Sequence, residues 1–133
     1  LFGETNNEQE NDWQLIEKFD SDLIVFTSYP GLIYKNPEDI PQNYYSEIRT
    51  HTSKPIAFTE IGWFRNGVTG WESSEQEQAQ FIERFFSLNK SLKQEFSVWS
   101  FLYDAQTIEP FNSMGLLQKT QESSLSWQEW LKN

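Results

Sequence analysis

A single carboxylate, Glu60, stands near the end of a short apolar run in the segment KPIAFTEIGW, residues 54–63. Near-continuous apolar runs are typical of strands buried on both faces of a parallel sheet, and α/β proteins place their functional groups where such strands end. A carboxylate at this position can act as a nucleophile or acid in glycoside chemistry, or as a metal ligand. The alternative is structural, with Glu60 bonded to helix N-termini or to an arginine such as Arg65.

Aromatic residues close to the same strand ends favour a sugar site. Tyr29 ends the first apolar run, Trp99 lies within the last, and Trp63 follows Glu60 by three residues. Sugar rings stack on aromatic faces, and a tyrosine hydroxyl can hydrogen-bond and orient a carboxylate. Each residue also has a packing interpretation, in which Trp99 belongs to the core, Tyr29 packs at a strand end and Trp63 fixes its loop.

Other acidic groups and the histidine offer less chemistry. Asp104 follows the last apolar run and can line the same mouth, with proton transfer as its less favoured role. Glu4 is not expected to be a catalytic acid. The spacing of acidic residues in 4–12 does not match a calcium-binding EF-hand loop. His51 is expected to end a helix, where a partial positive charge is favourable, and so to be structural.

Composition excludes several classes of protein. The formal net charge of −10 disfavours nucleic-acid binding, because such a chain repels phosphate backbones. The absence of Cys and the single His disfavour thiol catalysis, a Ser-His-Asp triad and a His- or Cys-ligated metal. No run approaches the roughly 18 apolar residues of a membrane span. We expect neither a metal nor a cofactor.

The apolar runs alternate with helical patterns, which predicts βαβ units, a parallel sheet and the α/β class. Ser74 with Glu77 forms a capping box at the start of the clearest helix, whose apolar face carries a Phe stripe. The predicted strands are about 22–28, 55–60 and 96–102, and the predicted helices are 7–19, 41–51, 73–92 and 124–132.

Three strands make an incomplete sheet. Both outer strands would have open edges, and a full (β/α)8 barrel takes roughly 250 residues, about twice this length. Two long loops, 63–74 and 104–124, follow the second and third strands, and loops of such length are usually functional. We therefore expect the chain to be part of a barrel, or to complete one with another copy or segment.

Five motifs together resemble a known group of enzymes. TSYP, KPIAFTEIGW, EQAQFIERF, WSFLYD and the closing GLLQKTQESSLSWQEWL resemble the C-terminal part of the clan A glycoside hydrolases, which are retaining (β/α)8 enzymes. The resemblance runs from about Trp13 to Trp130 and is strongest to the endo-β-1,4-galactanase family and its bacterial relatives. It implies that residues 1–133 form a single C-terminal half-barrel with the last three β/α units of a TIM barrel.

The resemblance also implies roles for individual residues. Glu60 would be the catalytic nucleophile at the end of the seventh strand, and Tyr29, at the end of the sixth, would hydrogen-bond it. Trp99, on the eighth, would form the platform under the sugar. Trp63, a weaker match, would form a wall of a neighbouring subsite. Asp104 is expected to bind substrate at the mouth because of its position after the last strand, not because of the resemblance.

One element of the family pattern is missing. The clan carries an acid/base glutamate, preceded by Asn, at the end of the fourth strand, and this chain would begin after the fifth. Retaining hydrolysis needs two carboxyl groups about 5–5.5 Å apart. The isolated chain is therefore expected to be inactive, and to self-associate or pair with a missing N-terminal half-barrel.

Two other functions are considered as alternatives to a retaining glycoside hydrolase. The chain can be a non-catalytic carbohydrate-binding or assembly module with a degenerate barrel, which the missing acid/base favours. A metal-dependent hydrolase is disfavoured, because the lone His leaves only carboxylates as ligands. The enzyme class implies polysaccharide degradation and an extracellular or cell-envelope location.

Overall fold

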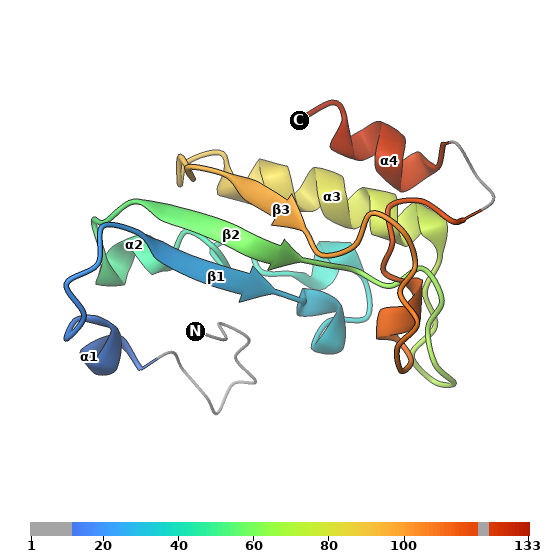
Figure 1. The fold of residues 1–133 in the computed structure, drawn as a ribbon, viewed down its shortest axis with the longest axis horizontal. Coiled ribbons are helices and arrows are strands. Elements are labelled where there is room, and N and C mark those ends of the chain that lie inside the picture. Colours follow the sequence, from blue (N-terminus) through green and yellow to red (C-terminus); the bar gives the residue numbers. More distant parts are fainter. Residues whose placement is uncertain (1–11, 120–122) are drawn as a thin grey trace.

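A computed structural model describes residues 12–119 and 123–133. Its strands β1 (Ile24–Ser28), β2 (Ile56–Ile61) and β3 (Ser97–Trp99) form one parallel sheet in the order β1-β2-β3. Figure 1 shows the three arrows running in the same direction, and the two long loops leave from the end to which they point. The parallel sheet is as predicted, although the first and third strands are shorter than expected.

The longest helix forms where local sequence signals agree. Ser74 caps α3 (Glu75–Asn89), because its hydroxyl accepts from the Glu77 N–H at 3.2 Å. The predicted pairing of Ser74 with Glu77 is therefore present, with the Glu77 carboxylate accepting from the Ser74 hydroxyl at 3.1 Å. Ser124 caps α4 (Leu125–Trp130) in the same way, through the Trp127 N–H at 2.9 Å. The described part of the chain also contains α1 (Trp13–Ile16), α2 (Ile48–His51) and the 3-10 helices η1 (Pro30–Leu32), η2 (Pro37–Asp39) and η3 (Phe111–Ser113).

Two predicted helices are shorter in the structure. The expected helix 41–51 is α-helical only in α2, because turns of the i→i−3 type precede it and the Ser46 and Thr50 hydroxyls donate to nearby backbone carbonyls. Residues 7–11 of the expected helix 7–19 lie outside the described residues, and within them the helix is limited to α1.

The core lies between the sheet and the helices. Phe58 of β2 packs edge-on against Tyr45 and Phe85, with ring centroids 5.5 and 5.2 Å away. In Figure 1, α2 and α3 lie behind the sheet. The predicted apolar face of α3 is buried here, and the residues that share this core include Ile24, Phe26, Ile56, Phe58, Phe81, Phe85, Leu88, Leu92 and Trp99.

The opposite face of the sheet is less covered, against the prediction of strands buried on both faces. In β1 the alternate residues Val25 and Thr27 are only half-buried, and Val98 in β3 is 46% exposed. Within the described residues the three strands form an open sheet. The closed barrel therefore stays a prediction.

The two long loops meet beyond the carboxyl ends of the strands. The Arg65 N–H donates to the Ser113 carbonyl at 2.9 Å, and the Asn66 N–H donates to the Ser113 hydroxyl at 3.2 Å. Figure 1 shows them side by side at that end of the sheet. Across the described ranges, no helix combines the length and apolar character needed to span a bilayer.

Candidate active site

A β-bulge in β2 presents Glu60 on the open face of the sheet. Phe26 of β1 lies opposite Phe58, but the next residue, Thr27, lies opposite Glu60, so Thr59 is an extra residue. Side chains of a regular strand alternate, and Glu60 would then share the covered face with Phe58. Because of the bulge, Thr59 and Glu60 are both exposed while Phe58 and Ile61 are buried. The polar pair between two core residues is the sequence signal for this bulge.

Hydroxyl groups from the two flanking strand ends connect to Glu60. The Tyr29 hydroxyl, just after β1, donates to Glu60 Oε2 at 2.9 Å, which is the contact that the family resemblance implied. It also lies 2.8 Å from the Ser100 hydroxyl, just after β3. Ser100 was not predicted, because nothing in the pattern SVWSF distinguishes it from an ordinary strand residue.

Gly62 makes room for the Tyr29 ring. A Cβ atom at residue 62 would lie 2.7 and 2.9 Å from two carbons of that ring, and 3.1 Å from the Met114 sulfur. Phe111 contacts the ring edge-on, with centroids 5.9 Å apart. The ring is therefore held between the backbone after β2 and the loop after β3, with its hydroxyl directed at Glu60.

Trp63 lies in the core, which corrects its prediction as a wall of a sugar subsite. Its ring is fully buried and stacks on Phe81 at 5.1 Å. Its indole N–H donates to the Ser73 hydroxyl at 3.1 Å, and its carbonyl accepts from the Gln78 side chain at 2.7 Å. These contacts fix the start of the loop to α3, and they leave no ring face for a ligand.

Trp99 is also a core residue, so its prediction as a sugar platform is corrected. Only 7% of its surface is exposed, and its ring contacts Phe81 and Trp130 on the helix side of the sheet. Its indole N–H donates to the Met114 carbonyl at 2.7 Å. The neighbours Val98 and Ser100 take the opposite face, because side chains alternate along a strand.

Asp104 joins the two long loops. Its Oδ2 forms an ion pair with Arg65, and its Oδ1 accepts from the Gly115 N–H at 3.0 Å. Arg65 is 4% exposed and also donates to the Gly115 carbonyl at 2.6 Å. Arg65 therefore binds Asp104 rather than Glu60, and both oxygens of Asp104 serve the structure of the loops, which does not support a role in proton transfer.

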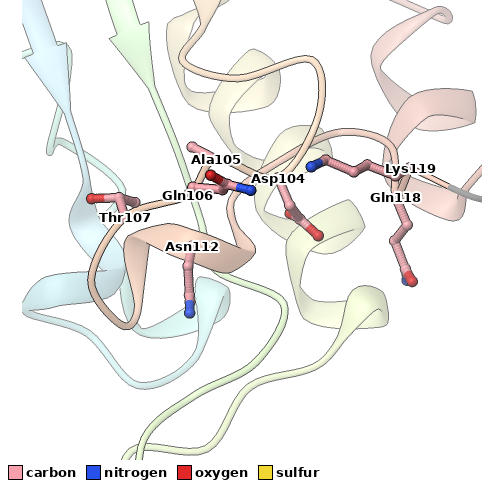
Figure 2. Close-up of a pocket in the computed structure, with 7 residues that line it drawn as sticks. All are labelled: Asp104, Ala105, Gln106, Thr107, Asn112, Gln118 and Lys119. Carbon is pink, nitrogen blue, oxygen red and sulfur yellow. The ribbon is translucent and has the colours of Figure 1, made fainter.

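A polar pocket of about 550 Å³ opens beside this ion pair. Figure 2 shows that its walls come from the loop after β3. Amide side chains, a hydroxyl and the Lys119 ammonium suit the hydroxyl groups of a carbohydrate, and Arg65 offsets the charge of Asp104. The lining residues are Asp104, Ala105, Gln106, Thr107, Asn112, Gln118 and Lys119, and Glu60 is not among them.

The loop after β2 folds back on the segment after β1. The Lys35 ammonium donates to the Gly70 carbonyl at 2.9 Å and lies 5.2 Å from the centre of the Trp71 ring, whose N–H donates to the Gly31 carbonyl at 2.9 Å. The Gly70 N–H donates to the Glu72 carboxylate at 2.9 Å and is the main reason why the pKa of Glu72 lies below its usual value. In the part of the chain that the structure describes, no three His, Cys, Asp or Glu side chains are grouped to hold a metal ion.

Comparison with known proteins finds likeness in structure only. No description of a protein family matches the chain. No curated protein sequence matches it.

Several solved structures share the fold. A β-glucuronidase from Bifidobacterium dentium matches with a TM-score of 0.67 and 17% identity, covering 85% of this chain and 20% of that one. A β-galacturonidase from Eisenbergiella tayi, described as GH2, matches with a TM-score of 0.59 and 17% identity over 84% of this chain and 23% of its own. A β-1,3-glucanosyltransferase from Rhizomucor miehei matches with a TM-score of 0.58 and 14% identity, covering 74% of this chain and 39% of that one.

These matches establish the fold of the chain as a segment found within larger carbohydrate-active proteins. The chain spans about a fifth of the length of the β-glucuronidase. At 14–17% identity, the likeness carries no assignment of substrate or of catalytic residues.

Proposed function

We propose that the chain is the C-terminal part of a retaining glycoside hydrolase that cleaves β-glycosidic bonds, with Glu60 as the nucleophile. The observation that carries the proposal is the bulge in β2, which presents Glu60 at the carboxyl end of the sheet with its Oε2 bonded to Tyr29. Bulges of this kind are frequent beside active sites, where they redirect a side chain. The shared fold with glycoside-processing proteins supports it.

The chemistry would proceed by double displacement. Glu60 Oε1, the oxygen that Tyr29 does not hold, would form a bond to the anomeric carbon while the glycosidic C–O bond breaks. An acid would give its proton to the departing oxygen. Water would then attack the same carbon, release Glu60 as carboxylate and return a proton to the acid/base group.

The acid/base carboxyl would come from outside these 133 residues, in an N-terminal half-barrel or another polypeptide. Together the parts would complete a clan A (β/α)8 barrel of the galactanase type. The complete enzyme would be exported and would degrade a polysaccharide. The chain by itself would not turn over unactivated glycosides. Asp104 would contribute to sugar binding by lining the polar pocket beside its ion pair with Arg65.

A second candidate function is carbohydrate binding or assembly without hydrolysis. It is favoured by the pocket after β3, whose walls of amides, a hydroxyl and an ammonium include no part of Glu60. In this case oligosaccharides would shift the NMR signals of Gln106, Asn112 and Gln118, and a Glu60→Gln variant would bind them equally well.

Activated substrates test the proposed nucleophile in this chain. A 2,4-dinitrophenyl β-glycoside has a leaving group that departs without an acid, so the 133-residue chain is expected to release dinitrophenol, whereas alkyl β-glycosides stay intact. Glu60→Ala should abolish this release, while Glu72→Ala, which removes another exposed carboxylate, should retain it. Equal release by wild type and Glu60→Ala would show that Glu60 is not the nucleophile.

A further inference from the structure

Ser100 occupies the centre of a short hydrogen-bonded series at the carboxyl ends of the strands. Its hydroxyl lies 2.8 Å from the Tyr29 hydroxyl and 3.0 Å from the Ile61 carbonyl oxygen. Tyr29 in turn lies 2.9 Å from Glu60 Oε2. The series therefore links β1, β2 and β3 through three contacts between oxygen atoms.

Counting protons shows that these three contacts cannot all be hydrogen bonds when Glu60 is ionised. A carboxylate and a carbonyl only accept, and each hydroxyl has one proton to donate. The two hydroxyl protons of Tyr29 and Ser100 can therefore supply only two of the three contacts. The charge on Glu60 fixes one of the two as the bond from Tyr29 to Glu60, because a charge-assisted bond is roughly twice as strong as a neutral one.

The backbone makes the Ser100 proton available to Tyr29. The Ile61 carbonyl already accepts from the Ser100 N–H at 2.9 Å, so it does not depend on the hydroxyl. With Glu60 ionised, Ser100 can donate to the Tyr29 oxygen while Tyr29 donates to Glu60. Both donors then point toward the carboxylate, an arrangement in which each bond polarises and strengthens the next.

We propose that Ser100 is a positioning residue that orients the Glu60 carboxylate through Tyr29. When Glu60 carries no charge, as in a glycosyl ester, Tyr29 can donate to Ser100 and Ser100 to the Ile61 carbonyl. Two protons thus satisfy two contacts in either state, and Tyr29 keeps its place. The consequence for catalysis rests on the proposed role of Glu60 as nucleophile, whereas the orienting contact does not.

A mutant cycle in the free energy of unfolding tests the relay without any activity. Ser100→Ala and Glu60→Gln are combined in the full 133-residue chain, once with Tyr29 and once with Tyr29→Phe. We expect the two changes to be coupled when Tyr29 is present and to be additive in the Phe background, because the hydrogen bonds of the described structure join Ser100 to Glu60 only through Tyr29. Additive effects in both backgrounds, or equal coupling in both, would overturn the proposal.

Two matched substitutions control this cycle. Ser97→Ala removes a buried hydroxyl of the same strand that has no hydrogen-bond partner among the described residues, and it should show no coupling to Glu60. Ser100→Thr and Ser100→Val have the same shape and differ in the hydroxyl, so only Thr should keep the coupling. This pair replaces Ser100→Ala if that variant does not fold, and identical behaviour of Thr and Val would also overturn the proposal.

The rate of release from the dinitrophenyl substrate separates this inference from the proposed function. Ser100→Ala should slow release by a factor of about two to ten, the value of one hydrogen bond, and should have no further effect on Tyr29→Phe. If wild type releases dinitrophenol through Glu60 and the two effects multiply, the relay is wrong and the nucleophile stands. If coupling is present but release does not depend on Glu60, the relay stands and the proposed nucleophile is wrong.

Discussion

The two faces of the sheet differ in chemistry although the same strands supply both. The covered face carries Phe26, Phe58 and Trp99 against the helices, whereas the open face carries Thr59, Glu60, Val98 and Ser100. A single extra residue in β2 places Glu60 on the open face. Packing therefore fixes the backbone on one face, and the β-bulge places a charged group on the other.

Substitutions at two adjacent residues of β3 should differ most in their cost to stability, because the residues lie on opposite faces of the sheet. Trp99→Ala should destabilise the chain by about 3–5 kcal/mol, because it empties a core site between α3 and α4. Val98→Ala, on the open face, should cost less than about 1 kcal/mol. Chemical denaturation measures both, and similar costs would show that the face of Val98 is covered as fully as the other.

The ion pair between the long loops should come next in effect. Arg65→Ala is expected to cost about 3 kcal/mol, since it leaves Asp104 Oδ2 and the Gly115 carbonyl without the donor they have in the structure. Lys132→Ala removes an exposed pair with Glu129 and should cost less than about 1 kcal/mol. The measurement is the difference between the two unfolding free energies. A cost for Arg65→Ala as small as that for Lys132→Ala would show that the ion pair does not hold the two loops together.

Gly62 packs against the ring of Tyr29, whose hydroxyl binds the Glu60 carboxylate on the open face. Gly62→Ala should cost about 1–3 kcal/mol, because the added methyl group meets the Tyr29 ring. In a Tyr29→Ala background the same substitution should cost much less. If the cost in that background is undiminished, the clash lies elsewhere and the ring does not depend on Gly62.

The smallest expected effect is on stability at acid pH and comes from Glu72, in the loop after β2. The folded chain holds the pKa of Glu72 below its ordinary value of 4.5, mainly through the Gly70 N–H. The stabilisation is therefore present above the unfolded pKa and is lost as the pH falls through the folded pKa. Glu72→Gln should remove this part of the acid dependence, which urea unfolding at several pH values would reveal as a shallower decline. If the stability of Glu72→Gln falls with decreasing pH as steeply as that of the wild type, Glu72 does not contribute to the acid dependence.

Local patterns predicted the elements because their causes are local. The pairing of Ser74 with Glu77 needs only residues three apart, and the alternation of apolar runs with helical patterns needs only the order along the chain. The lengths of the outer strands were overestimated, because apolar residues such as Leu102 continue past the last sheet contact and are exposed.

The faces of the strands could not be predicted from the sequence. Near-continuous apolar runs contain no alternation, so SVWSF does not reveal whether Trp99 or its neighbours meet the helices, and the Trp99 assignment failed for this reason. The Trp63 assignment failed because the start of its loop packs against α3, and the residues around Trp63 do not specify that contact. The contact between Tyr29 and Ser100 joins residues 71 positions apart, and depends on the strand order and the bulge. Glu60 and Tyr29 were found because each ends a strand of a parallel sheet, where side chains meet.

Trapping and locating the covalent intermediate tests directly whether Glu60 is the nucleophile. The chain is treated with a 2-deoxy-2-fluoro-β-glycosyl fluoride, whose leaving group needs no acid and whose glycosyl ester hydrolyses slowly, and is then digested and analysed by mass spectrometry. We expect one added fluorosugar, carried by Glu60 in the peptide that contains TEIGW, and none in Glu60→Gln. A label on another residue, or none in the folded wild-type chain, would contradict this expectation.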